Sequence, residues 1–92
     1  MADVDGNVLV SSTAVGIPAP KLVFRPRVAT LTVEDANIRY RISGNDPTGG
    51  NAGGHLVANG SHLTITGLGN IEKLRMIRDA STDAQVFFTL EK

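Results

Sequence analysis

Hydrophobic and polar side chains alternate with a period of two residues over several stretches of this chain. The clearest stretch is 37–43, in which apolar residues alternate with basic and polar ones: Ile38, Tyr40 and Ile42 against Arg39, Arg41 and Ser43. Successive side chains of a strand point to opposite faces, so this pattern predicts a strand with one apolar and one basic face. Leu63 and Ile65 repeat the pattern within 61–66. Both stretches predict a β framework.

Further stretches extend this framework. Residues 28–33 are rich in Thr and Val, which is typical of strands, and they place Ala29, Leu31 and Val33 on one face. Residues 55–57 and 21–24 are short strand candidates, the second cut off by Pro26, and residues 85–90 form the last strand. The alternation predicts one buried β core made of Ile38, Tyr40, Ile42, Leu63, Ile65, Val86, Phe88 and Leu90.

The stretch 70–78 fits two templates. A helix would place Ile71, Leu74 and Arg78 on one stripe, whereas a strand would place Leu74 and Met76 on one face and Ile71 on the other. The intrinsic preferences of its Glu, Lys, Leu, Arg and Met residues favour a helix. Because all neighbouring elements are predicted strands, we interpret 70–78 as a strand, with the helix as the alternative.

About seven short strands, joined by turns rich in glycine and asparagine, predict an all-β fold: a small antiparallel β-sandwich or barrel. Strands do not alternate with helices, which argues against a parallel α/β fold. We assign this domain to residues 21–92. Residues 1–20 are interpreted as an extended N-terminal arm and not a core element, although Val8, Leu9 and Val10 could pair as a short strand. Pro18 and Pro20 favour an extended path. A frayed terminus is the alternative interpretation.

The composition of the 92-residue chain narrows the classes of function. Nine Lys and Arg balance nine Asp and Glu, and a net charge of zero argues against a dedicated nucleic-acid binder. Basic residues gather in 21–41, which predicts either solvated strand faces or a local basic patch. The acidic start is unlike a signal peptide, and no apolar run reaches membrane-spanning length. Without cysteine, a domain this small commonly gains stability by oligomerisation.

No arrangement of residues points to catalysis, to a metal or to a cofactor. His55 and His62 lack the partners and spacing of a zinc site, and Ser61 beside His62 does not make a catalytic triad. The glycine-rich stretch 44–54 lacks the Gly-Lys-Ser/Thr ending of a phosphate-binding loop, so we interpret it as a surface loop that orders against a neighbour. The aromatic residues expected in the core are Phe24, Phe87 and Phe88.

Several short motifs follow one another between residues 38 and 90. A basic, alternating strand enters a Gly-x-x-Pro-Thr turn within 38–48, and a Gly-His-Leu segment follows at 54–56. A Gly-x-x-Leu-Thr-Ile strand, an Ile-x-x-Leu-Arg-x-Ile-Arg segment and a final alternating strand complete the series at 60–65, 71–78 and 86–90. This series resembles a pattern found in small structural proteins of tailed bacteriophages, and the resemblance does not reach residues 1–20.

This resemblance implies a virion component without enzymatic activity: a capsid decoration (cement) protein that binds and stabilises neighbouring capsid subunits. A neck or tail accessory protein and a carbohydrate-binding host-attachment module are the alternatives. The implied partners are the major capsid protein or other virion subunits, and the implied location is the virion, assembled in the host cytoplasm. We expect a homo-oligomer, preferably a trimer, because icosahedral capsids offer three-fold positions.

The residues expected to contact a partner lie in the arm, on the basic strand face and in the glycine-rich loop. They are Val8, Leu9, Val10, Pro18, Pro20, Arg39, Arg41, Asn45, Asp46, Thr48 and Asn51. If the arm makes such contacts, a chain that starts at Lys21 should fold but bind its capsid weakly.

Overall fold

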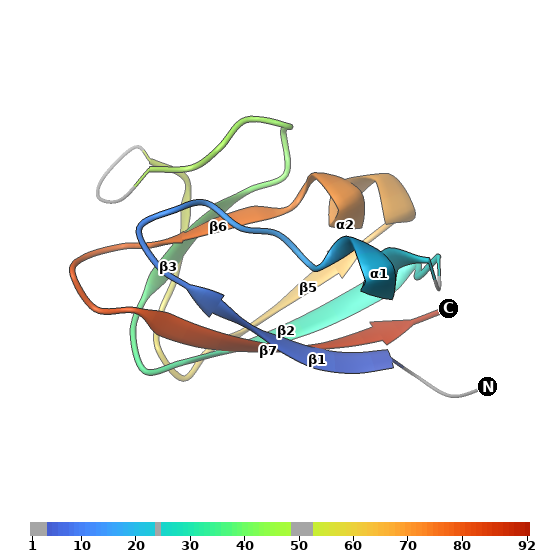
Figure 1. The fold of residues 1–92 in the computed structure, drawn as a ribbon, viewed down its shortest axis with the longest axis horizontal. Coiled ribbons are helices and arrows are strands. Elements are labelled where there is room, and N and C mark those ends of the chain that lie inside the picture. The colour runs from blue at the N-terminus through green and yellow to red at the C-terminus, as the bar shows by residue number, and fades with distance from the viewer. Residues whose placement is uncertain (1–3, 24, 49–52) are drawn as a thin grey trace.

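Two antiparallel β-sheets that share one hydrophobic core make up the fold (Figure 1). The computed structural model describes residues 4–23, 25–48 and 53–92. The elements of this part of the chain are β1 (Val4–Val10), α1 (Ala19–Leu22), β2 (Val28–Glu34), β3 (Ile38–Arg41), β4 (His55–Val57), β5 (His62–Thr66), α2 (Leu68–Lys73), β6 (Arg75–Arg78) and β7 (Ala84–Glu91). The first sheet has the strand order β1–β7–β2–β5, and the second has the order β4–β3–β6. The predicted small all-β fold is thus confirmed.

The core is built from strand positions that alternate with exposed ones. Along β7 every second residue is buried, and these residues lie opposite the buried face of β2 in the register Leu90 to Ala29, Phe88 to Leu31 and Val86 to Val33. Most of the predicted core is correct, since Ile38, Ile65, Val86, Phe88 and Leu90 are buried. The other predicted members are half-buried and pack against this core: Tyr40, Ile42 and Leu63.

The second sheet is centred on β3, the strand with the clearest alternation in the sequence. On its inner face Tyr40 lies between His55 of β4 and Met76 of β6, and Met76 is fully buried. On its outer face Arg39 lies between Leu56 and Ile77. The predicted two-sided character of this strand is therefore correct.

The N-terminal segment is not the extended arm that the sequence predicted. Residues Val4–Val10 form β1, which pairs with β7 along its whole length. After β1 the chain crosses to the second sheet, where Val15 and Met76 exchange backbone hydrogen bonds of 2.9 and 2.7 Å. Val10 and Ile17 are buried in the core. The boundary expected between residues 20 and 21 does not separate two units, because both lie inside α1.

A glycine explains why the sequence concealed β1. The inward positions of this strand are Val4, Gly6, Val8 and Val10, so the apolar alternation is interrupted at its second member. A Cβ atom at Gly6 would lie 2.6 Å from Cζ of Phe88, because the phenyl ring of Phe88 fills the space above this glycine. The ring of Phe88, on the neighbouring strand β7, thus fills the inward space at which Gly6 has no side chain.

The strand expected over 21–24 is also wrong, since the chain forms the short helix α1 there. Pro18 is the residue before the helix and keeps an extended ψ of 132°, and a proline occupies one of the first two helical positions. Proline is well suited to a helix start because its missing N–H would have no partner within the helix. Phe24 lies outside the described residues. Pro26, which follows, is buried.

Residues 68–78 contain both a helix and a strand, so the strand interpretation of 70–78 is wrong for its first half. Helix α2 buries Ile71 and ends at Leu74, whose ψ of 127° is already extended. Strand β6 then buries Met76. Phe87 corrects a further expectation, since 51% of it is exposed on the outer face of β7.

Candidate interaction surface

The candidate residues of β1 divide between the core and the surface. Val10 is fully buried in the core, and Val8 is half-buried against it. Leu9 is 50% exposed on the outer face of the first sheet. Pro18 is exposed before α1, whereas the side chain of Pro20 lies outside the described part of the structure.

Arg39 forms a clamp inside the chain, so its guanidinium is already engaged by intrachain partners. Its side chain is only 13% exposed, and its Nε donates a 2.7 Å hydrogen bond to Oδ1 of Asp79. Its Nη1 also donates to the carbonyl oxygen of Gly54, at 3.2 Å. Arg39 therefore ties β3 to the turn after β6 and to the residue before β4.

This clamp predicts that two carboxylates, those of Asp79 and Asp83, contribute unequally to the free energy of unfolding. Replacing Asp79 with Ala should lower the free energy of unfolding by about 1–3 kcal/mol, because the guanidinium of Arg39 loses a partner in a half-buried position. Asp83 accepts a 2.7 Å bond from Arg78, but 43% of its side chain is exposed. Asp83→Ala should therefore cost at most about 1 kcal/mol. Urea denaturation of both variants measures this difference, and equal losses would show that Arg39 does not depend on Asp79.

The loop between β3 and β4 is held against the sheet by its own backbone and by apolar packing. Pro47 is buried, and the N–H of Thr48 donates to the carbonyl oxygen of Gly53 at 2.8 Å. Gly54 has a φ of 144°, and a Cβ there would lie 2.7 Å from the carbonyl oxygen of Tyr40, so a side chain would collide with β3. These contacts fix how the loop leaves and rejoins the sheet.

Three candidate residues of this loop are exposed: Asn45, Asp46 and Thr48. Asp46 lies 3.9 Å from Nε of Arg75, a contact between two exposed groups that contributes little to stability. Arg75 in turn lies directly opposite Arg41 in the β3–β6 register. We call the group Arg41, Asn45, Asp46, Thr48 and Arg75 the loop surface. Asn51 lies outside the described residues.

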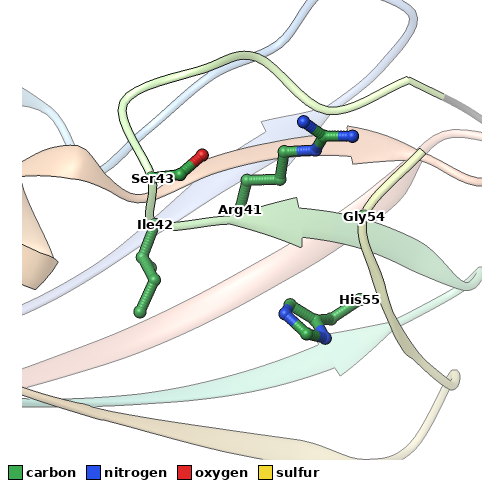
Figure 2. Close-up of a pocket in the computed structure, with 5 residues that line it drawn as sticks. All are labelled: Arg41, Ile42, Ser43, Gly54 and His55. Carbon is green, nitrogen blue, oxygen red and sulfur yellow. The ribbon is translucent and has the colours of Figure 1, made fainter. Parts of the chain in front are cut away.

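An open pocket of about 430 Å³ lies beside the loop surface and is lined by Arg41, Ile42, Ser43, Gly54 and His55. In Figure 2 the side chains of Arg41 and Ser43 lie on one side of the chain that leaves β3, and those of Ile42 and His55 lie on the other. The ring of His55 also lies 5.2 Å from that of Tyr40. The guanidinium of Arg41 and the hydroxyl of Ser43, which lie on the same side, can donate hydrogen bonds to a carboxylate or amide of a partner.

Among the described residues, no three His, Cys, Asp or Glu side chains come together as the ligands of a metal ion would. His62 is exposed on β5, on the other sheet from His55. The helices of the described part are too short or too polar to cross a membrane.

A second exposed surface was not recognised in the sequence. The outer face of the first sheet carries threonines on three adjacent strands: Thr30, Thr32, Thr64, Thr66 and Thr89. The same face exposes Phe87 beside β1. The T-x-T patterns on β2 and β5 were visible in the sequence and mark this polar face. The exposure of Phe87 follows from the same period of two, because its neighbours Val86 and Phe88 are both buried.

Comparison with models of protein families, with curated proteins and with solved structures found no match to this chain.

Proposed function

We propose that the protein is a structural component of a tailed-bacteriophage virion, a capsid decoration protein that binds neighbouring subunits of the major capsid protein. The observation that carries the proposal is the position of the motif residues that resemble such proteins. Pro47 and Gly54 of these motifs hold the loop against β3, while Asn45, Asp46 and Thr48 remain exposed. A buried framework that presents a polar loop is suited to contact with another protein.

The loop surface can recognise a partner through charge and hydrogen bonds. It combines carboxylate, amide and hydroxyl groups with the guanidinium of Arg75, and the adjacent pocket offers donors to a carboxylate side chain. Contacts of this kind give specificity and orientation at an interface. The motif-bearing loop is therefore the part of the surface that we assign to the capsid.

A decoration protein of this kind would act by binding alone. Attachment to the assembled lattice, and not to separated subunits, stabilises the lattice by mass action, with no chemical step and no cofactor. The net charge of zero favours a protein partner over nucleic acid. The protein would join the particle in the host cytoplasm and remain in the virion as a homo-oligomer.

Sedimentation of the protein with capsid shells that lack it tests this proposal. The variant Asn45→Ala/Asp46→Ala/Thr48→Ala should bind the shells at least about tenfold more weakly, equivalent to about 1.4 kcal/mol. The control His62→Ala/Thr64→Ala changes two exposed polar residues of the other sheet and should bind as the wild type does. Circular dichroism of both variants checks that the fold is unchanged.

The same experiment separates the alternatives. Failure of the wild-type protein to bind shells, together with binding to bacterial surface glycan, would replace the decoration role with host attachment. Localisation to the neck or tail of intact particles would replace it with an accessory role there. Equal binding of the loop variant and the wild type would show that the capsid is contacted through another surface.

A further inference from the structure

Strand β1 leaves the longest unpaired sheet edge in the part of the chain that the structure describes. It is seven residues long and contains no proline, lysine or arginine, which are the residues that commonly protect an edge from pairing. The opposite edge of the same sheet is β5. This edge is partly occupied, because the carbonyl oxygen of Thr66 already accepts a 3.0 Å bond from Nδ2 of Asn70.

The edges of the second sheet are shorter or partly covered. Strand β4 has three residues. Along β6, Val15 pairs with Met76, and the N–H of Arg78 donates to the carbonyl oxygen of Ser11 at 3.0 Å. The chain that follows β1 thus covers the edge of β6 and leaves that of β1 open.

The hydrogen bonds of β2 determine which backbone groups of β1 point outward. The N–H of Val33 donates to the carbonyl oxygen of Ser61, so the backbone groups of Val33 point toward β5. Arg27, just before β2, gives no single direction, because its carbonyl accepts from Gly67 while its N–H donates to Glu91 of β7. Backbone groups alternate along a strand, so the even-numbered residues of β2 bond to β7, where their partners are odd-numbered. The even-numbered residues of β7 therefore bond to β1, and their partners in β1 are also even-numbered. The backbone groups left at the open edge belong to Asp5, Asn7 and Leu9.

We propose that this edge pairs with the same edge of a second copy of the chain, antiparallel and about a two-fold axis at Asn7. Asn7 then faces its counterpart, and Asp5 faces Leu9 of the other copy. Each facing pair exchanges two backbone bonds, about six in all, and the outward groups of β1 are satisfied. The two first sheets become one continuous sheet across the axis.

Strand β1 is complementary to itself in this register. Its inward residues are all apolar or glycine, so the inner face of the joined sheet stays apolar. Val4 and Val8, which are half-buried at the edge of the core, gain cover from the neighbouring strand. Asp5 is the single charged residue of β1.

Charge placement also favours this register. Because Asp5 faces Leu9, the two aspartates are about 13 Å apart along the strands, beyond the screening length of about 8 Å. A register displaced so that each Asp5 faced the other would place like charges directly opposite, which is destabilising. The centred register also pairs the whole of β1 with its copy.

The symmetry of this contact differs from that expected from the sequence. An antiparallel pairing of identical strands uses the same surface on both copies and closes as a dimer, whereas a trimer needs two different surfaces. The pairing is an independent proposal from capsid attachment, because the loop surface lies on the second sheet and its connections.

Sedimentation equilibrium of the full chain tests the pairing. We expect a concentration-dependent dimer for the wild type. Asn7→Pro removes the N–H that faces the edge while leaving the backbone bonds from β1 to β7 in place, and should weaken dimerisation at least about tenfold. The control Asn7→Thr keeps this N–H and should dimerise as the wild type does. The 3.4 Å side-chain bond from Nδ2 of Asn7 to Oε1 of Gln85 is lost in the proline variant and in the control alike. Thermal unfolding of both variants checks that β1 is still in place.

A pair of charge variants tests the register. Leu9→Lys and Leu9→Asp both remove the exposed leucine, but only the lysine would face the opposite charge of Asp5 in the other copy. We expect the lysine variant to dimerise at least about tenfold more tightly than the aspartate variant, with the difference shrinking at high salt. Equal dissociation constants would overturn the register.

A single-chain mass for the wild type at about 1 mM, or a trimer that survives Asn7→Pro, would overturn the pairing itself. Capsid sedimentation of Asn7→Pro is read separately, so loss of the dimer and failure of capsid binding can be distinguished.

Discussion

A chain that starts at Lys21 is expected to be unfolded. The deletion removes β1 and leaves the edge of β7 without its partner. It also removes Val10 and Ile17 from the core, and each buried side chain of this size contributes about 1.5–3 kcal/mol. The bridge between Val15 and Met76 is lost with them. These losses approach the total stability of a small domain, about 5–15 kcal/mol.

Circular dichroism and thermal unfolding of the shortened chain measure this effect. The matched control is a chain that starts at Val4 and so keeps β1 whole, and the difference between the two shortened chains is the contribution of residues 4–20. A cooperative transition in the chain that starts at Lys21 would show that β1 is dispensable. It would also restore the arm that the sequence predicted.

Replacing Phe88 with Ala is expected to lower the free energy of unfolding by about 3–5 kcal/mol. Phe88 is 2% exposed and lies between Gly6 of β1 and Leu31 of β2. Because Gly6 has no side chain, nothing from β1 can fill the space that the phenyl ring leaves. The cavity should therefore persist in the variant, and the cost should lie at the upper end of the range.

The neighbouring residue supplies the control for this experiment. Phe87→Ala removes the same atoms from a position that is 51% exposed, so the expected loss is below about 1 kcal/mol. Urea denaturation of the two variants gives both values under one set of conditions. Equal losses would contradict the assignment of Phe88, and not Phe87, to the core.

The strands that the sequence predicted well are those in which every inward position carries a side chain. The alternations around Leu31, Tyr40, Ile65 and Phe88 all correspond to strands in the structure. β1 was not predicted as a core strand because its inward row contains Gly6, and the residue that fills the gap lies far away in the chain. A pattern within one segment contains no information about what a distant segment contributes.

Helix α1 was missed, and the helix within 70–78 was kept only as the alternative, for local reasons. Near Pro18 the sequence indicates an extended path, but proline is equally compatible with the first turn of a helix. In 68–78 a helix of six residues and a strand of four share one window, so neither period dominates. Leu74 belongs to both patterns because it ends the helix and precedes the strand.

The candidate surface could be predicted only in part, because some of its residues contact residues that are distant in the sequence. The sequence placed Asn45, Asp46 and Thr48 in an exposed loop, and they are exposed. It placed Arg39 on an outer strand face, which is also correct, but Asp79 covers it there. The two residues are 40 positions apart, and their proximity depends on the pairing of β3 with β6.

The pairing of β1 with β7 has a consequence for the order in which the chain folds. Val4 lies opposite Leu90, whereas the pairs between β3 and β4 join residues that are much closer in sequence. Closing a long loop costs entropy before its contacts form, so such pairings form slowly. During synthesis β1 must wait for the residues of β7, and it leaves the ribosome as an unpaired apolar strand. Chaperone capture of this strand, or pairing between nascent chains, would compete with folding until Leu90 has been made.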